Sequence, residues 1–145
     1  MPVSNKEYEF LEHTADVYIA AYGKDLNEAF ANAAKAMFDV MTDIKSIEPK
    51  VSVNIEVREE DLEALLYSWL EHLLILFDTE LLLFSEFEVN IRKENELYIL
   101  KGKAKGEKFN PHKHPSKTEI KAVTYSLMEI LKKDNTFVVK FVLDI

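Results

Sequence analysis

Residues 62–77 carry apolar side chains at the i, i+3, i+4 and i+7 spacing of a helix, and this stripe constrains the fold more than any other part of the sequence. The stripe comprises Leu62, Leu65, Leu66, Trp69, Leu70, Leu73, Leu74 and Phe77. Apolar character continues to residue 84, but charged residues interrupt it, so no run reaches the roughly 18 apolar residues of a membrane-spanning helix. The sequence therefore predicts a buried core helix over residues 62–84 and no membrane segment.

A second amphipathic helix is predicted over residues 26–41. Asp25 is a good N-cap, and Glu28, three residues later, completes a capping box. Residues 51–57 alternate between apolar and polar side chains, which predicts a strand with one buried face. Further predicted strands cover residues 8–11, 17–22, 86–92, 96–103, 127–131 and 136–144, with a polar loop over 106–115 and residues 120–126 open between a strand and a helical turn. These elements predict an α+β fold, two amphipathic helices packed on a mostly antiparallel β-sheet, in a single domain spanning residues 1–145.

The composition excludes several classes of function. Because the chain has no cysteine, it can form no disulfide, thiolate zinc site or thiol nucleophile. The net charge of −8 argues against direct, high-affinity nucleic-acid binding and favours a basic protein as partner. The three glycines form no phosphate-binding or dinucleotide motif. The first eight residues are polar and lack the apolar core of a signal peptide, so we expect a cytoplasmic protein.

The chain ends on an acid at the end of a predicted strand. Asp144 and Ile145 follow an apolar and β-branched run, and Asp16 lies beside a short strand near the other terminus. If the terminal strands pair, Asp16, Asp144 and the carboxylate of Ile145 gather in one small volume. Three anionic groups repel one another unless a cation lies among them, and hard divalent ions prefer such oxygen ligands. The alternative is that each acid caps a turn or is solvated at a strand end.

Several short segments, in order along nearly the whole chain, carry a family pattern. They are His-Thr-Ala-Asp at 13–16, Asp-Leu-Asn-Glu-Ala-Phe at 25–30, Leu-Leu-Tyr-Ser-Trp-Leu at 65–70, Gly-Glu at 106–107 followed by His114, Ile-Lys-Ala-Val-Thr-Tyr at 120–125, and the terminal Asp-Ile. In these segments the chain resembles the archease family. One departure is that Ser126 stands where the family usually has histidine.

The resemblance implies a function that the composition does not show. Archeases activate the GTP-dependent RNA ligase of tRNA splicing, which joins a 2′,3′-cyclic phosphate or 3′-phosphate end to a 5′-hydroxyl. They promote guanylylation of the ligase's active-site histidine and support its multiple turnover. The family binds a divalent metal, usually Ca²⁺, and the ligands carried over by motif are Asp16, Asp144 and Ile145. The implied partner is the tRNA-splicing RNA ligase.

The four histidines have structural or functional interpretations. His13, beside a strand end, is either a metal ligand, a proton carrier or a hydrogen-bonded structural residue. His112 and His114 lie in the predicted polar loop, where we expect a partner contact rather than a transition-metal pair, since no third ligand is placed by spacing. His72 flanks the apolar stripe and is expected at the edge of the core.

Alternative functions follow from the same residues. Lys121, Thr124 and Tyr125 are either a docking patch or the polar side of a packed element. A stand-alone metal-dependent hydrolase using Asp16 and Asp144 is the second hypothesis, although the sequence places neither a general base nor a substrate pocket. A chaperone-like protein-binding module is the third, and it leaves the end-of-strand carboxylates unexplained.

Overall fold

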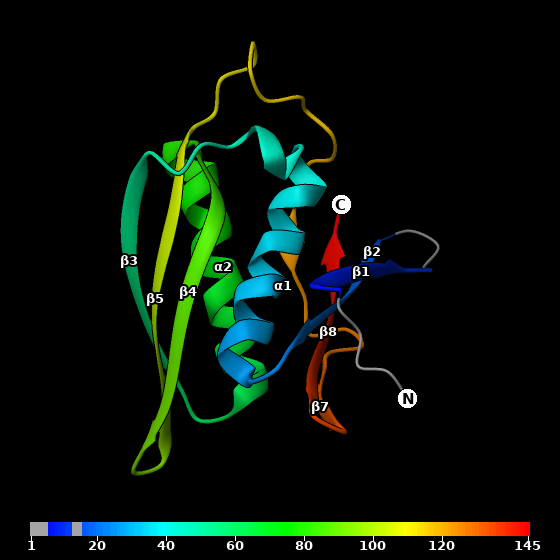
Figure 1. Ribbon diagram of the computed structural model, residues 1–145, viewed down its shortest axis with the longest axis vertical. Coiled ribbons are helices and arrows are strands. Elements are labelled where there is room, and N and C mark those ends of the chain that lie inside the picture. The colour runs from blue at the N-terminus through cyan, green and yellow to red at the C-terminus, as the bar shows by residue number, and fades with distance from the viewer. Residues whose placement is uncertain (1–5, 13–15) are drawn as a thin grey trace.

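In the computed structural model, which describes residues 6–12 and 16–145, two helices lie between two β-sheets (Figure 1). The elements are β1 (Tyr8–Leu11), β2 (Val17–Gly23), α1 (Leu26–Met41), the 3₁₀ turn η1 (Ile44–Ser46), β3 (Val51–Glu59), α2 (Leu62–Glu80), β4 (Leu82–Glu94), β5 (Leu97–Lys108), β6 (Ala122–Val123), β7 (Glu129–Lys133) and β8 (Thr136–Asp144). The α+β prediction is confirmed.

The strands form two antiparallel sheets rather than one. Sheet A has the order β1-β2-β8-β6, with β7 also paired to β8, and sheet B has the order β3-β5-β4. All the strand pairs of the described residues are antiparallel. The predicted antiparallel strands are divided between two sheets because both helices are apolar on more than one side. α1 contacts β4 of sheet B and β2 of sheet A, and α2 contacts β3 of sheet B and β6 of sheet A.

The start of α1 confirms the predicted cap. The side chain of Asp25 accepts a hydrogen bond from the Glu28 N–H at 2.8 Å. The Glu28 carboxylate accepts one from the N–H of Lys24 at 3.0 Å, one residue before the cap, so the capping box is shifted by a residue. Ala29, Ala33, Ala34 and Ala36 of α1 are fully buried, and their small side chains let the helix lie close to both sheets.

The start of α2 is fixed by its N-cap, and its position against α1 is fixed by Trp69. Asp61 accepts from the Ala64 N–H at 2.7 Å. Trp69 is fully buried, and its ring N–H donates to the Phe30 carbonyl of α1 at 3.0 Å, which joins the two helices. A Cβ at Gly102 of β5 would meet the Trp69 ring at 2.6 Å, so glycine is needed where sheet B lies against this ring.

The prediction that α2 continues to residue 84 was wrong. The helix ends at Glu80, and Leu81 follows in the left-handed region with φ 57°. Leu82–Glu94 then forms β4. Apolar periodicity did not reveal this end because the buried residues 82–84 serve the core equally well from a strand. No helix of the described residues is long and apolar enough to cross a membrane.

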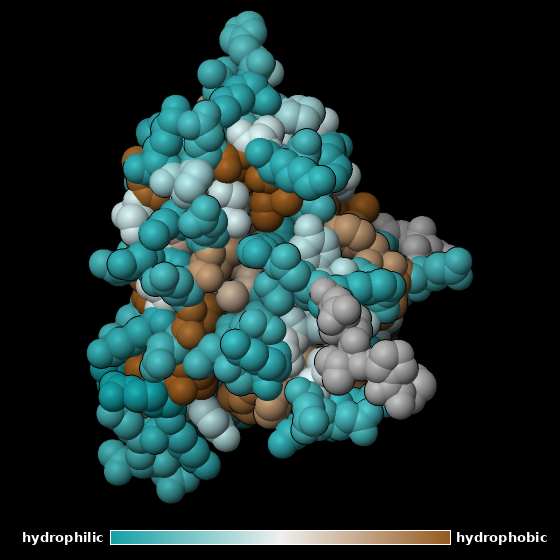
Figure 2. Space-filling model, viewed as in Figure 1, coloured by the Kyte–Doolittle hydropathy of each residue, from teal (hydrophilic) through white to brown (hydrophobic). Residues whose placement is uncertain are grey.

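β5 also runs further than predicted. It ends at Lys108, so residues 106–108 belong to a strand and not to the predicted loop. A Cβ at Gly106 would overlap the carbonyl of Leu83, beside the irregularity between Phe84 and Glu86 where β4 and β5 shift register. The open segment 120–126 contains the short strand β6. On the face drawn in Figure 2, hydrophilic residues predominate and hydrophobic ones form small separate patches.

Candidate functional site

The two acids of the predicted metal site lie at the same end of neighbouring strands. β2 and β8 pair antiparallel, with Val17 opposite Leu143. Asp16 directly precedes Val17, and Asp144 directly follows Leu143. If the register continues by one residue, Asp16 stands opposite Asp144, and cross-strand partners project from the same face of a sheet. The strand that pairs with β8 is the second strand of the chain, not the first.

A third strand holds the backbone beside the chain end. β6 lies on the other side of β8 from β2, with Ala122 opposite Asp144. The Lys121 N–H donates to the Asp144 carbonyl at 2.7 Å. Asp144 and Ile145 are both partly exposed.

The chemistry of these donors fits a hard divalent ion. Within residues 6–12 and 16–145, no group of three or more His, Cys, Asp or Glu side chains is arranged to hold a metal. The predicted set has only two such side chains, Asp16 and Asp144, and its third donor is the terminal carboxylate of Ile145. All are oxygen donors of the kind that Ca²⁺ takes. The metal assignment stays a prediction, and His13 lies outside the described residues.

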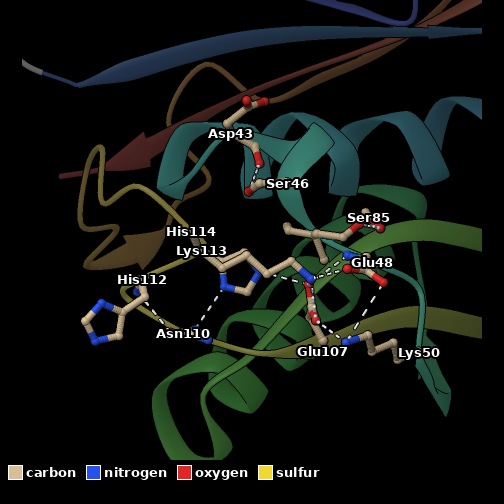
Figure 3. Close-up of polar contacts among 11 residues, drawn as sticks. Asp43, Ser46, Glu48, Lys50, Ser85, Glu107, Asn110, His112, Lys113 and His114 are labelled. Carbon is tan, nitrogen blue, oxygen red and sulfur yellow. Dashed lines mark hydrogen bonds and ion pairs between the residues drawn. The ribbon is translucent and has the colours of Figure 1, made fainter.

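A second polar centre, the Glu107 cluster, lies where β5 ends (Figure 3). It consists of Glu48, Glu107, Asn110, Lys113 and His114. The Glu107 side chain is only 10% exposed, and one of its oxygens, Oε2, takes three donors. They are the Glu48 N–H at 2.8 Å, the Lys113 ammonium at 2.8 Å and the His114 Nε2 at 2.9 Å.

These donors set the ionisation of Glu107. Burial by itself raises the pKa of its carboxyl, but the Glu48 N–H, the Lys113 ammonium and the His114 ring outweigh burial and lower the pKa to about 2. Hydrogen bonds to the carboxylates of Glu107 and Glu48 raise the pKa of Lys113. Glu107 is therefore a fixed anion and a very weak base, which does not suit it to proton abstraction.

His114 is a structural residue of this cluster. It is 1% exposed, and its Nδ1 accepts the N–H of Asn110 at 2.9 Å. Since Nδ1 is an acceptor, a neutral ring carries its proton on Nε2 and donates to Glu107. His114 itself is therefore not available for a partner contact, and the contact expected of the loop stays a prediction. His112 is exposed, and Figure 3 shows its ring turned away from Glu107.

Residues 109–121, which we call the strap, lead from the Glu107 cluster to the chain end. The N–H groups of Lys117 and Thr118 donate to the carbonyls of Met41 and Val40 at 3.0 and 3.1 Å. These bonds satisfy carbonyls that the last turn of α1 leaves free. The strap then reaches Lys121, whose N–H bonds Asp144. One continuous segment thus joins the cluster, the end of α1 and the chain end.

The remaining predicted residues are divided between structural and exposed positions. His72 is exposed, so its expected place at the core edge was wrong. The Thr124 hydroxyl donates to the Val142 carbonyl at 2.9 Å and is structural. Lys121 and Tyr125 are exposed, and Ser126 donates its N–H to the Thr124 hydroxyl at 3.2 Å.

A hollow of about 710 Å³ lies elsewhere on the molecule. It is formed by the end of β2, the first turns of α1 and part of β4, and it is lined by residues such as Tyr22, Asn32 and Phe87. Neither Asp16 nor Asp144 lines it. The hydrolase hypothesis needs a substrate pocket at these acids, and this hollow does not provide one.

Comparison with known proteins places the chain among archeases. The model of the Archease protein family (MTH1598/TM1083) matches residues 8–145. "Protein archease" of Sulfurisphaera tokodaii is 51% identical over 140 residues, covering 97% of this chain and 99% of the relative. The corresponding protein of Sulfolobus acidocaldarius is 54% identical over 138 residues, covering 95% and 98%.

Two solved structures are similar in fold. The solution structure of Methanobacterium thermoautotrophicum protein 1598 has a TM-score of 0.86 and 43% identity, covering 96% of this chain and 99% of that one. The Thermotoga maritima protein TM1083, described as an archease and possible chaperone, has a TM-score of 0.60 and covers 93% and 94%. At 19% identity, this second likeness concerns the fold alone.

Proposed function

The chain belongs to the archease family, and we propose that it activates the GTP-dependent RNA ligase of tRNA splicing in the cytoplasm. In this role it promotes guanylylation of the ligase's active-site histidine and supports multiple turnover. It is not itself an enzyme. Membership of the family along residues 8–145 supports this proposal.

The observation that carries the proposed site is the register of β2 against β8. It brings Asp16 and Asp144 to the same end of adjacent strands, next to the chain end. These residues and the carboxylate of Ile145 would hold a hard divalent ion such as Ca²⁺. When bound, such an ion supplies positive charge that can orient phosphate oxygens.

The residues of the chain contribute positioning rather than chemistry. The Lys121 N–H fixes the backbone of Asp144, and the paired strands fix its direction. Preorganised carboxylates of this kind hold a cation without losing further conformational entropy on docking. The strap connects this end to the Glu107 cluster, whose buried bonds keep the segment in one conformation.

The test mixes purified ligase, GTP and this protein. We expect faster formation of guanylylated ligase and many ligation turnovers per ligase molecule. The protein alone should hydrolyse neither GTP nor a phosphodiester substrate in the presence of Ca²⁺ or Mg²⁺. Unchanged guanylylation in the mixture would contradict the proposal, and hydrolysis by the protein alone would support the metal-dependent hydrolase instead.

A further inference from the structure

Two stacked tyrosines form an exposed aromatic platform between α2 and the segment after β6. The rings of Tyr67 and Tyr125 lie 4.4 Å apart, centroid to centroid, and are parallel to within 5°. Tyr125 is nevertheless 54% exposed. Because Tyr67 covers one face of this ring, the exposed part is mainly its opposite face and its edge.

Carboxylates surround this platform. Burial and the charges of Glu59, Asp61 and Glu71 raise the pKa of Tyr125. Glu59 also accepts the hydroxyl of Ser68, the residue after Tyr67, at 2.8 Å. A hydrogen bond to Glu71 raises the pKa of Tyr67. In residues 6–12 and 16–145, none of the three acids forms an ion pair with a lysine or arginine. Asp61 is hydrogen-bonded as the N-cap of α2, but no lysine or arginine of the described residues neutralises these acids. The platform therefore combines an open aromatic face with nearby negative charge that lacks a cationic partner.

A tight turn holds Tyr125 in place. The Tyr125 carbonyl accepts the Met128 N–H at 3.2 Å, and Leu127 within this turn has φ 54°. A leucine in the left-handed region costs energy that glycine would avoid. Its side chain is 51% exposed, so the turn presents a second apolar group next to the platform.

We propose that the Tyr67–Tyr125 platform is a docking surface that receives an arginine side chain from a basic segment of the partner ligase. A planar guanidinium stacks on an aromatic face and can at the same time form paired hydrogen bonds with a carboxylate. A lysine ammonium has neither the plane nor the paired donors. The inference rests on the proposed function, because that function supplies the partner.

The position of the platform agrees with a single docking event that includes the chain end. Ala122 pairs with Asp144, and Tyr125 lies three residues beyond Ala122. Three extended residues span at most about 11 Å, and paired strands add about 5 Å. The Cα of Tyr125 therefore lies within about 16 Å of the Cα of Asp144.

The test measures ligase affinity and activation separately. Tyr125→Ala should raise the Kd for the ligase about tenfold, while saturating protein still gives the wild-type maximum of guanylylation. Tyr125→Phe, which keeps the ring, should retain most of the affinity. Leu97→Ala, at an exposed apolar residue of the β4–β5 hairpin, is the matched control and should leave the Kd unchanged.

A chemical probe tests the arginine preference without the ligase. The peptide acetyl-Gly-Arg-Gly-amide should shift the NMR signals of the Tyr67 and Tyr125 rings more than acetyl-Gly-Lys-Gly-amide does. Equal shifts from the two peptides, or none, would overturn the assignment of an arginine. If wild type binds and activates the ligase but Tyr125→Ala binds equally well, the docking surface is wrong while the proposed function stands. A wild-type protein that does not bind the ligase at all would overturn both.

Discussion

Replacing Glu107 by glutamine should destabilise the fold strongly, although the change removes only a charge and no volume. One carboxylate oxygen accepts the Glu48 N–H at 2.8 Å, the Lys113 ammonium at 2.8 Å and the His114 Nε2 at 2.9 Å. The other oxygen accepts a second bond from Lys113 at 3.0 Å. A glutamine amide turns one of these positions into a donor, so either the Lys113 ammonium or the three donors at Oε2 then face another donor.

The magnitude follows from these contacts. A hydrogen bond to a charged group contributes about 1.5–3 kcal/mol, and removing one partner of a buried charged pair costs about 3–5 kcal/mol. Because the bonds share one side chain, their energies do not add, and we expect a total loss of about 3 kcal/mol. For a chain of this length such a loss lowers Tm by about 10 °C.

The assay is urea denaturation followed by circular dichroism, with Glu48→Gln as the control. The Glu48 side chain is 58% exposed, and its ion pair with Lys113 lies at the surface. The substitution preserves the backbone N–H that Glu48 donates to Glu107. The control should therefore unfold at nearly the wild-type midpoint. If Glu107→Gln and Glu48→Gln unfold at the same urea concentration, the charged contacts of Glu107 do not stabilise the fold.

Three further predictions concern pH, the turn and the chain end. Because the pKa of Glu107 is about 2 in the folded protein and ordinarily 4.5, its stabilisation is complete above pH 4.5 and is lost as the pH falls towards 2. Acid titration of stability should show this slope in wild type and a smaller one in Glu107→Gln, and identical slopes would contradict the assignment. Leu127→Gly should raise the free energy of unfolding by about 0.5 kcal/mol by relieving the left-handed conformation; a lower urea midpoint would show that the leucine contacts outweigh the strain. Amidation of Ile145 should weaken Ca²⁺ binding measured by calorimetry, and an unchanged affinity would remove the chain-end carboxylate from the ligand set.

Most helices and strands of this fold could be predicted from patterns among residues close in the sequence. The cap at Asp25, the alternating strand at 51–57 and the closing hairpin were all predictable because each depends on residues close in sequence. The division into two sheets was not predictable in this way, since it depends on which faces of α1 and α2 each strand covers. The end of α2 at Glu80 was missed because Leu81 carries no sequence signal of its left-handed conformation.

Only part of the candidate site could be predicted, because some of its contacts join residues far apart in the sequence. The hypothesis that the first and last strands pair suggested Asp16 and Asp144 as neighbours, and the structure pairs β8 with β2 rather than with β1. The Glu107 cluster could not be predicted, because Glu48 lies 59 residues away and contributes only a backbone N–H. The Tyr67–Tyr125 stack joins a helix to a segment 58 positions later. Neither tyrosine stands out from the residues of its own segment, so the sequence does not indicate the contact.

Multiple-turnover ligation by the ligase, with this protein in catalytic amount, tests the central claim most directly. Wild-type protein should support many turnovers. Asp16→Ala and Asp144→Ala should bind the ligase and keep the wild-type circular dichroism spectrum, yet fail to stimulate it, because each removes one of three oxygen donors from the proposed cation site. Full stimulation by either variant would contradict the assignment of the chain end as the activating site.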